Sequence, residues 1–104
     1  MKTEYYYKDT ATLEDFADSN DLTMQVRERS DPKLPRFFAY FKNVEIQEGG
    51  CLISASGNGN TTTEAVKDYA KAISGKSVVI SAYSTDRREL KVPTILDIGD
   101  EHAK

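Results

Sequence analysis

Two adjacent glycines, Gly49–Gly50, separate two segments whose residues are typical of β-strands. FFAYFKNVEI at 37–46 precedes them and is rich in aromatic and β-branched side chains, and CLISAS follows them. Because glycine readily adopts the positive φ of a two-residue hairpin turn, this pattern predicts an antiparallel β-hairpin. Alternation along the first strand places Phe37, Ala39 and Phe41 on one face and Phe38 and Tyr40 on the other.

A third strand is predicted before this hairpin. In LTMQVRERS, the apolar residues Leu22, Met24 and Val26 alternate with polar ones, which is the period of a half-buried strand. The prolines of the following SDPKLPR remove backbone donors and predict an exposed loop. The three strands form an antiparallel sheet in this interpretation, with Cys51 as a small buried hydrophobe.

Capping patterns predict two helices. Thr12 is followed three residues later by Asp15 in TLEDFADSN, where the apolar residues have helical spacing. Thr61 and Glu64 form a capping box at the start of TTTEAVKDYAKAI, and Gly75 is expected to end that helix. The segment GNGN before the second helix is interpreted as a strand-to-helix turn with conformational glycines, since the lysine of a Walker phosphate loop is missing.

Two further extended segments, KSVVISAYS and ELKVPTILDI, follow the second helix and are expected either to pair as a hairpin or to extend the sheet. The predicted fold is a single α+β domain of order α-β-β-β-α, with both helices on one face of an antiparallel sheet, plus a C-terminal strand pair. The expected parts are a tail or strand at 1–10, a core at 12–74, a strand pair at 77–98 and a tail at 99–104.

Composition argues against several classes of function. The 104 residues carry a net charge of −3, so any basic partner surface must be local. Cys51 is the only cysteine and His102 the only histidine, which argues against a cysteine zinc site, a histidine-assisted enzyme, and any bound metal or cofactor. The N-terminal sequence lacks a signal-peptide core and no apolar run reaches membrane-spanning length, so a cytoplasmic protein with no membrane partner is expected.

The order of elements over residues 12–74 resembles the double-stranded RNA-binding domain. That family enters its second helix through Gly-x-Gly-x-Ser followed by lysines and an alanine, and Gly57, Gly59, Thr61 and Ala65 fit this pattern. The resemblance implies two helices packed on one face of a three-stranded sheet, and binding of duplex RNA.

The positions of the family's phosphate-clamping lysines differ in this chain, because Thr62, Thr63 and Val66 occupy them. Each lost phosphate contact removes part of the sequence-independent affinity, so the resemblance implies weakened nucleic-acid binding. The alternative hypothesis is therefore nucleic-acid binding by a variant surface, formed by Lys33, Arg36, Lys67 and Lys71.

Residues 37–74 also resemble the HicB-type antitoxins, in which a hairpin leads through Gly-Asp-Thr into a helix that begins Glu-Glu-Ala. The corresponding stretch here is GNTTTEAVKDYAKAI. Those proteins bind a toxin, so this resemblance implies a protein partner.

The leading hypothesis from the sequence is a non-catalytic protein-interaction module, of the size and type of a phage or mobile-element accessory protein. Phe38 and Tyr40 on the exposed sheet face, and Glu14 and Asp18 on the acidic first helix, are predicted to contact an unidentified protein partner. Self-association through the aromatic face would give a homodimer.

Overall fold

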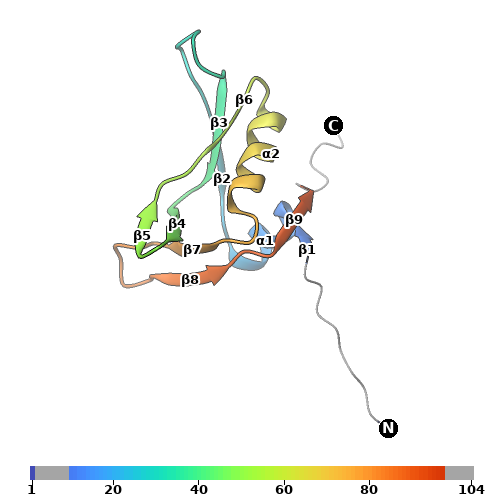
Figure 1. Cartoon of the computed structure of the whole chain (residues 1–104), viewed down its shortest axis with the longest axis vertical. Coiled ribbons are helices and arrows are strands. Elements are labelled where there is room, and N and C mark those ends of the chain that lie inside the picture. The colour runs from blue at the N-terminus through green and yellow to red at the C-terminus, as the bar shows by residue number, and fades with distance from the viewer. Residues whose placement is uncertain (2–9, 98–104) are drawn as a thin grey trace.

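The computed structural model describes Met1 and residues 10–97, which form an α+β fold (Figure 1). The predicted order of a helix, antiparallel strands, a second helix and C-terminal strands is confirmed. In chain order the elements are β1 (Thr10–Thr12), α1 (Leu13–Asn20), β2 (Met24–Glu28), β3 (Phe37–Phe41), β4 (Val44–Glu48), β5 (Cys51–Ile53), β6 (Gly57–Gly59), α2 (Thr62–Ile73), β7 (Ser77–Ile80), β8 (Arg88–Lys91) and β9 (Thr94–Asp97).

A three-stranded antiparallel sheet is present, in the order β2-β3-β6. Its third strand is Gly57–Gly59, which was expected to be a turn, whereas the predicted third strand CLISAS provides β5, which pairs with β4 in a separate sheet. Phe38 of the central strand β3 lies opposite Arg27 on one side and Asn58 on the other, while Tyr40 lies opposite Gln25. Directly opposed residues of a sheet point to the same face. This register therefore gathers these five side chains on one face.

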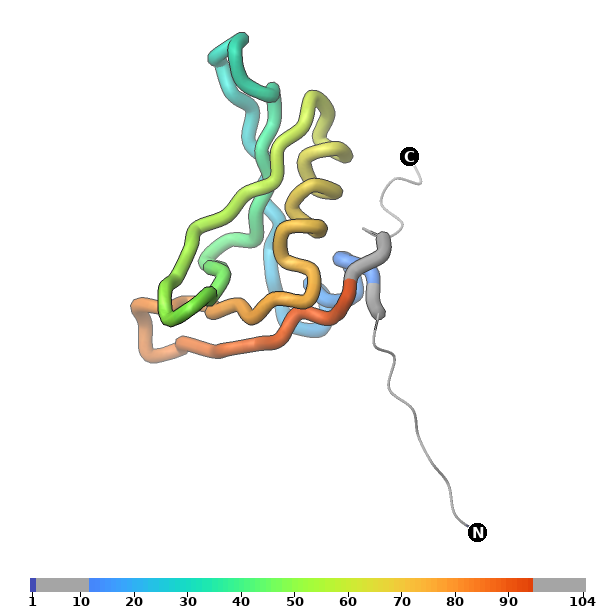
Figure 2. The backbone as a smooth tube through the Cα atoms, viewed as in Figure 1, coloured from blue at the N-terminus to red at the C-terminus, as the bar shows by residue number. Residues whose placement is uncertain are grey.

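The central hairpin bends sharply, which the sequence did not indicate. Asn43 has φ of 63°, in the left-handed region, and separates β3 from β4. The chain thereby leaves the three-stranded sheet and enters a four-stranded one of order β5-β4-β7-β8. The returning strand makes the same change between β5 and β6, as the tube in Figure 2 shows. The turn between the two strands is made by Gly49 and Gly50, both with positive φ as predicted.

The C-terminal segments realise both of the expected arrangements. β7 pairs with β8 as a hairpin and also pairs with β4, so it extends the sheet. Val92 and Pro93 interrupt the segment ELKVPTILDI, and its second half, β9, pairs in parallel with β1 instead. The tyrosines at 5–7 and the tail at 99–104 lie outside the described residues.

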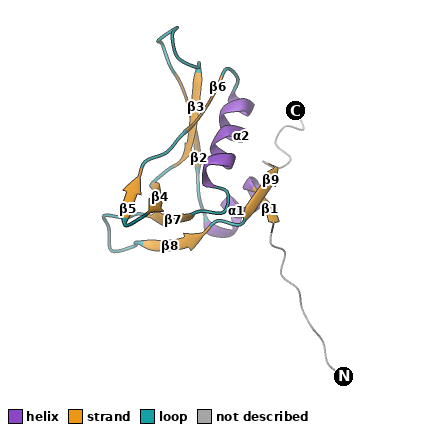
Figure 3. Cartoon of the chain, in the orientation of Figure 1, coloured by secondary structure: helices purple, strands orange, loops and turns teal. Residues whose placement is uncertain are grey.

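Both helices pack on the face of the three-stranded sheet to which Phe41 points (Figure 3), and Phe38 and Tyr40 point to the other face by alternation along β3. Phe41, which is 1% exposed, lies between them, with ring centroids 6.3 Å from Phe16 of α1 and 5.5 Å from Tyr69 of α2. Burial raises the pKa of the Tyr69 phenol, and a hydrogen bond with the backbone of Phe41 offsets part of this rise. The strands β4 and β7 complete the core, whose members are Leu13, Phe16, Phe41, Val44, Ile46, Tyr69, Ala70, Ile73, Val78, Ile80 and Val92.

The predicted helix caps are confirmed. The hydroxyl of Thr12 accepts a hydrogen bond from the Asp15 N–H at 3.0 Å, and that of Thr61 accepts one from the Glu64 N–H at 3.0 Å. The Glu64 carboxylate accepts in turn from the Asn60 N–H at 2.9 Å, so this pair of side chains satisfies the N–H groups of Asn60 and Glu64. Neither described helix, with 8 and 12 residues, is long and apolar enough to cross a membrane.

Gly57 and Gly59 have a different role from the one predicted. Both lie within β6, where neither has a positive φ, so conformational freedom does not explain them. A Cβ at Gly57 would collide with the backbone of Ala65 and Tyr69, and one at Gly59 with Glu64 and Ala65. The glycines are needed because α2 packs directly against the strand backbone.

Two burial predictions on the strands are wrong. Cys51 is exposed, because it begins β5, which lies at the edge of the four-stranded sheet. Val26 is 39% exposed, although it lies on the helix face opposite Ala39, because α2 covers the centre of the sheet more fully than the outer strand β2.

Candidate functional site

The face of the three-stranded sheet that carries no helix is the first candidate site. We call it the open face. Its side chains come from alternate positions of β2, β3 and β6, together with Arg29 just beyond β2, and they are Gln25, Arg27, Arg29, Phe38, Tyr40 and Asn58.

Phe38 and Tyr40 form the aromatic centre of the open face. Their ring centroids are 6.0 Å apart with an interplanar angle of 20°, so the rings are stacked, and both side chains are half-buried. The Arg29 guanidinium lies over the Phe38 ring at 4.5 Å from its centroid. It also donates to the Asn58 Oδ1 at 2.6 Å and to the Pro35 carbonyl at 2.9 Å. These bonds hold the guanidinium over the ring.

The charges of the open face are all positive among the described residues. Arg27 is exposed beside Phe38, Arg29 lies on the ring, and the exposed Lys42 follows Tyr40 at the next alternate position, where its N–H donates to the Thr23 carbonyl at 2.9 Å. The positions of β2, β3 and β6 that point to this face include no carboxylate. The acids of α1 and α2 lie instead on the helix side of the sheet.

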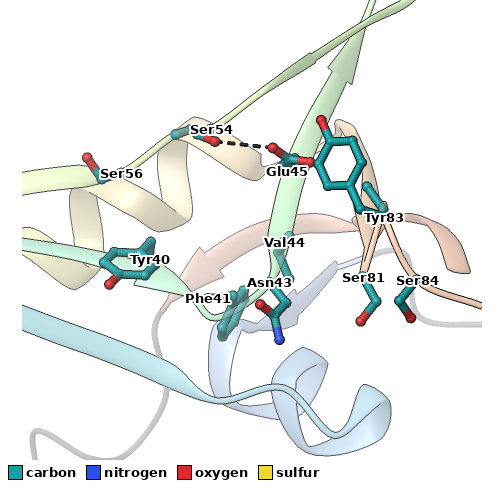
Figure 4. Close-up of a pocket in the computed structure, with 12 residues that line it drawn as sticks. Tyr40, Phe41, Asn43, Val44, Glu45, Ser54, Ser56, Ser81, Tyr83 and Ser84 are labelled. Atoms are coloured by element: carbon teal, nitrogen blue, oxygen red, sulfur yellow. Dashed lines mark hydrogen bonds between the residues drawn. The ribbon is translucent and has the colours of Figure 1, made fainter. Parts of the chain in front are cut away.

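A cleft of about 660 Å³ adjoins the open face where the hairpin bends (Figure 4). Tyr40 is shared by the open face and the cleft, and Tyr83, 87% exposed, lies at the opposite wall. Between them the cleft is lined by Asn43, Ser54, Ser56, Ser81 and Ser84, with Phe41 and Val44 from the core. The volume is in the range of small-molecule sites.

Glu45 is the charged group of this cleft. Its side chain is half-buried, and the hydroxyl of Ser54 donates to its Oε2 at 3.2 Å. Within the described residues no lysine or arginine forms an ion pair with it, whereas Glu28, Glu48 and Glu89 each have one. The carboxylate therefore retains capacity to accept hydrogen bonds from a ligand.

The structure brings together only part of the predicted protein-binding set. Phe38 and Tyr40 are neighbours, as predicted. Glu14 and Asp18 are exposed on α1, and α1 packs through Phe16 on the other face of the sheet. One flat surface cannot include both pairs.

The cations of the alternative set are also separated. Lys33 is exposed in the loop before β3, and Arg36 forms an exposed ion pair with Glu28 at 2.6 Å. Lys67 and Lys71 lie one turn apart on the exposed side of α2, on the helix side of the sheet. The described residues thus offer two cationic regions on the loop and helix, distinct from the open face.

Several residues of the two candidate sites were either not predicted from the sequence or were predicted without their partners. Arg29 and Asn58 needed the strand register to be placed on either side of Phe38, and no local pattern gives that register. Glu45 and Tyr83 needed the bend at Asn43, which brings the start of β4 and the segment after β7 to one cleft. Alternation along the strand was the sequence signal for this face, since Arg27 and Arg29 alternate with the inward-facing Val26.

No protein-family model matches the chain, and no curated protein or solved structure shows significant similarity to it. Among the described residues, no group of three or more histidine, cysteine, aspartate or glutamate side chains is placed to hold a metal ion. The open face and the adjoining cleft are therefore the two candidate sites of the described residues.

Proposed function

We propose that the protein binds single-stranded nucleic acid noncovalently on the open face. The observation that supports this is the fixed stack of Arg29, Phe38 and Tyr40 on a surface whose described charges are all positive. Aromatic rings on a protein surface stack with unpaired bases, and surrounding cations neutralise the phosphates of the same strand. Single-stranded nucleic acid provides both unpaired bases and phosphates.

The aromatic pair supplies the sequence-tolerant part of the binding. Every base has a π-face, and stacking on a protein ring contributes about 1–3 kcal/mol per base. The stacked bases of a duplex are not accessible in this way, so a single strand is favoured. Because Arg29 is already hydrogen-bonded to Asn58 and Pro35, little side-chain freedom is lost on binding.

The cations supply the salt-dependent part. Three phosphate contacts, by Arg27, Arg29 and Lys42, give a slope of about −2 in log affinity against log salt for a single strand. This corresponds to about a 20-fold loss of affinity between roughly 50 and 200 mM salt. The net charge of −3 does not exclude this binding, because the acids lie elsewhere.

Fluorescence anisotropy with labelled single-stranded DNA and RNA of about 12 nucleotides, and with the matching duplexes, tests the proposal. We expect salt-sensitive binding of a single strand in preference to duplex, and about a tenfold loss for Phe38→Ala. The double variant R27A/K42A should lose at least about tenfold and flatten the salt slope by about 1.4. Arg29 is not substituted, because its hydrogen bond to the Pro35 carbonyl holds the end of the loop between β2 and β3.

The matched control is K67A/K71A, which removes the same number of charges from the helix side. It should leave single-strand affinity unchanged. If this variant loses binding and R27A/K42A does not, the site is the helix surface implied by the resemblance to double-stranded RNA-binding domains, and the proposal is wrong. Tighter binding of the duplex than of the single strand would also show that the proposal is wrong.

A protein partner on the same aromatic pair is the rival outcome. In that case no oligonucleotide binds at low salt, and sedimentation velocity shows a homodimer or a stable complex that Phe38→Asp disrupts without unfolding the domain. An apolar contact of this kind has little salt dependence, which separates it from a phosphate contact.

A further inference from the structure

The cleft beside the open face contains a carboxylate, which base stacking does not require. It places the half-buried carboxylate of Glu45 beside Tyr83, across the cleft from Tyr40, at one end of a cationic, aromatic surface (Figure 4). A carboxylate is an unfavourable neighbour for a phosphate. Its position here is explained if the cleft holds a base and the phosphates remain on the open face.

We infer that this cleft is a guanine-selective base pocket, an inference that rests on single-strand binding by the open face. Tyr40 belongs to both surfaces, so a strand stacked on Phe38 and Tyr40 leads directly into the cleft. The next base then enters the cleft that Tyr40 and Tyr83 line, with its Watson–Crick edge toward Glu45.

The carboxylate selects guanine because of the donors that each base presents. Guanine has two adjacent donors, N1–H and the N2 amine, and a carboxylate accepts both in the parallel geometry of a bidentate pair. Adenine and cytosine present one amine beside a ring nitrogen acceptor, which faces the second carboxylate oxygen unfavourably. Thymine and uracil present one N–H between two carbonyls. Guanine is therefore the one common base that satisfies both oxygens.

The surroundings of Glu45 favour this orientation. The Ser54 hydroxyl donates to Oε2 and fixes the carboxylate, while no described cation competes for it. A bidentate base contact of this type corresponds to about tenfold discrimination or more. The serine hydroxyls of the cleft can donate to the guanine O6.

The experiment compares oligothymidine of about eight nucleotides with the same strand carrying one central guanosine, inosine or adenosine. We expect guanosine to raise affinity by about tenfold over thymidine, and inosine, which lacks the N2 amine, to lose most of that gain. Glu45→Gln should abolish the guanosine-to-thymidine ratio. Glu48→Gln, on the same strand but paired with Lys76 outside the cleft, should retain it.

The outcomes separate the two proposals. If oligothymidine binds and guanosine gives no gain, or if the ratio survives in Glu45→Gln, the cleft is not a guanine pocket and binding by the open face still stands. If no strand binds, both proposals are wrong. Circular dichroism of Glu45→Gln verifies that a lost ratio does not reflect a lost fold.

Discussion

Replacing Gly57 by alanine tests the packing of β6 directly against α2. The added Cβ would overlap the backbone nitrogen of Tyr69 and the carbonyl oxygen of Ala65, and neither is the flexible end of a side chain. Strand and helix must therefore separate. Their separation also strains the 2.8 Å hydrogen bond from the Asn58 N–H to the Asp68 carboxylate.

The expected loss in free energy of unfolding combines overpacking and the strained hydrogen bond with one effect that opposes them. Overpacking costs about 1–3 kcal/mol, and a weakened hydrogen bond to a charged group adds about 1 kcal/mol. Replacing glycine restricts the unfolded chain and returns about 0.4–1 kcal/mol. The free energy of unfolding of Gly57→Ala should thus fall by about 2 kcal/mol, which lowers Tm by roughly 10 °C in a domain of this length.

Urea unfolding followed by circular dichroism measures this loss from the shift in midpoint at constant m value. Gly75 provides the control. It has φ of +73° and a Cβ added there would meet no atom within 4 Å, so its substitution costs conformational strain alone, about 1 kcal/mol. Serine should be worse than alanine at Gly57 but equal to alanine at Gly75. A Gly57→Ala protein within about 0.5 kcal/mol of the parent would refute the close packing of α2.

Three further variants test the core and a cap. Phe41→Ala should lower the free energy of unfolding by about 3–5 kcal/mol, because it removes the ring that packs between the helices. A loss below about 1 kcal/mol would contradict this packing. Thr61→Ala removes the acceptor for the Glu64 N–H and should cost about 1 kcal/mol, while Thr61→Asn should retain most of the stability. Because the Tyr69 pKa is raised above 10.0, the native state holds a proton that the unfolded state releases, so stability should fall above about pH 10 by up to about 1.4 kcal/mol per pH unit. Tyr69→Phe should lack this part of the alkaline loss, and an unchanged pH dependence would refute the assignment.

Local patterns in the sequence were sufficient for both helices and for the hairpin turn, but not for β6, which was expected to be a turn. The caps at Thr12 and Thr61, the turn at Gly49–Gly50 and the alternation of Phe38 and Tyr40 against Ala39 and Phe41 each depend on residues within one turn or one strand. Such features are determined by backbone geometry that a few neighbouring residues settle. The α+β class follows from their order.

The bend in the hairpin could not be predicted, because both of its halves are good strand formers. FFAYFKNVEI has the pattern of one strand, and only Asn43 adopts a left-handed conformation that asparagine tolerates but does not require. The bend becomes favourable when Val44 and Ile46 pack in the core with Val78 and Ile80 of β7, a segment more than thirty residues further along the chain. The cleft with Glu45 and Tyr83 exists because of that long-range pairing.

Acidic and basic side chains lie on opposite sides of the three-stranded sheet, and this arrangement leads to a further prediction. Asp15 and Asp18 lie exposed on α1, on the helix side, while Arg27 and Lys42 lie on the open face. A helix layer is about 10 Å thick, close to the Debye length of about 8 Å at physiological salt, so the acids are largely screened from a strand on the open face there.

At about 10 mM salt the Debye length is near 30 Å, and the same acids then repel the strand. The double variant D15N/D18N should therefore tighten single-strand binding at low salt and leave it unchanged at physiological salt, as anisotropy at the two salt concentrations would show. A control variant that removes acids from neither helix, Glu48→Gln, should have a smaller effect, since Glu48 is already paired with Lys76. If D15N/D18N instead weakens binding at both concentrations, the acidic helix contacts the ligand directly, and the partner is not a polyanion on the open face.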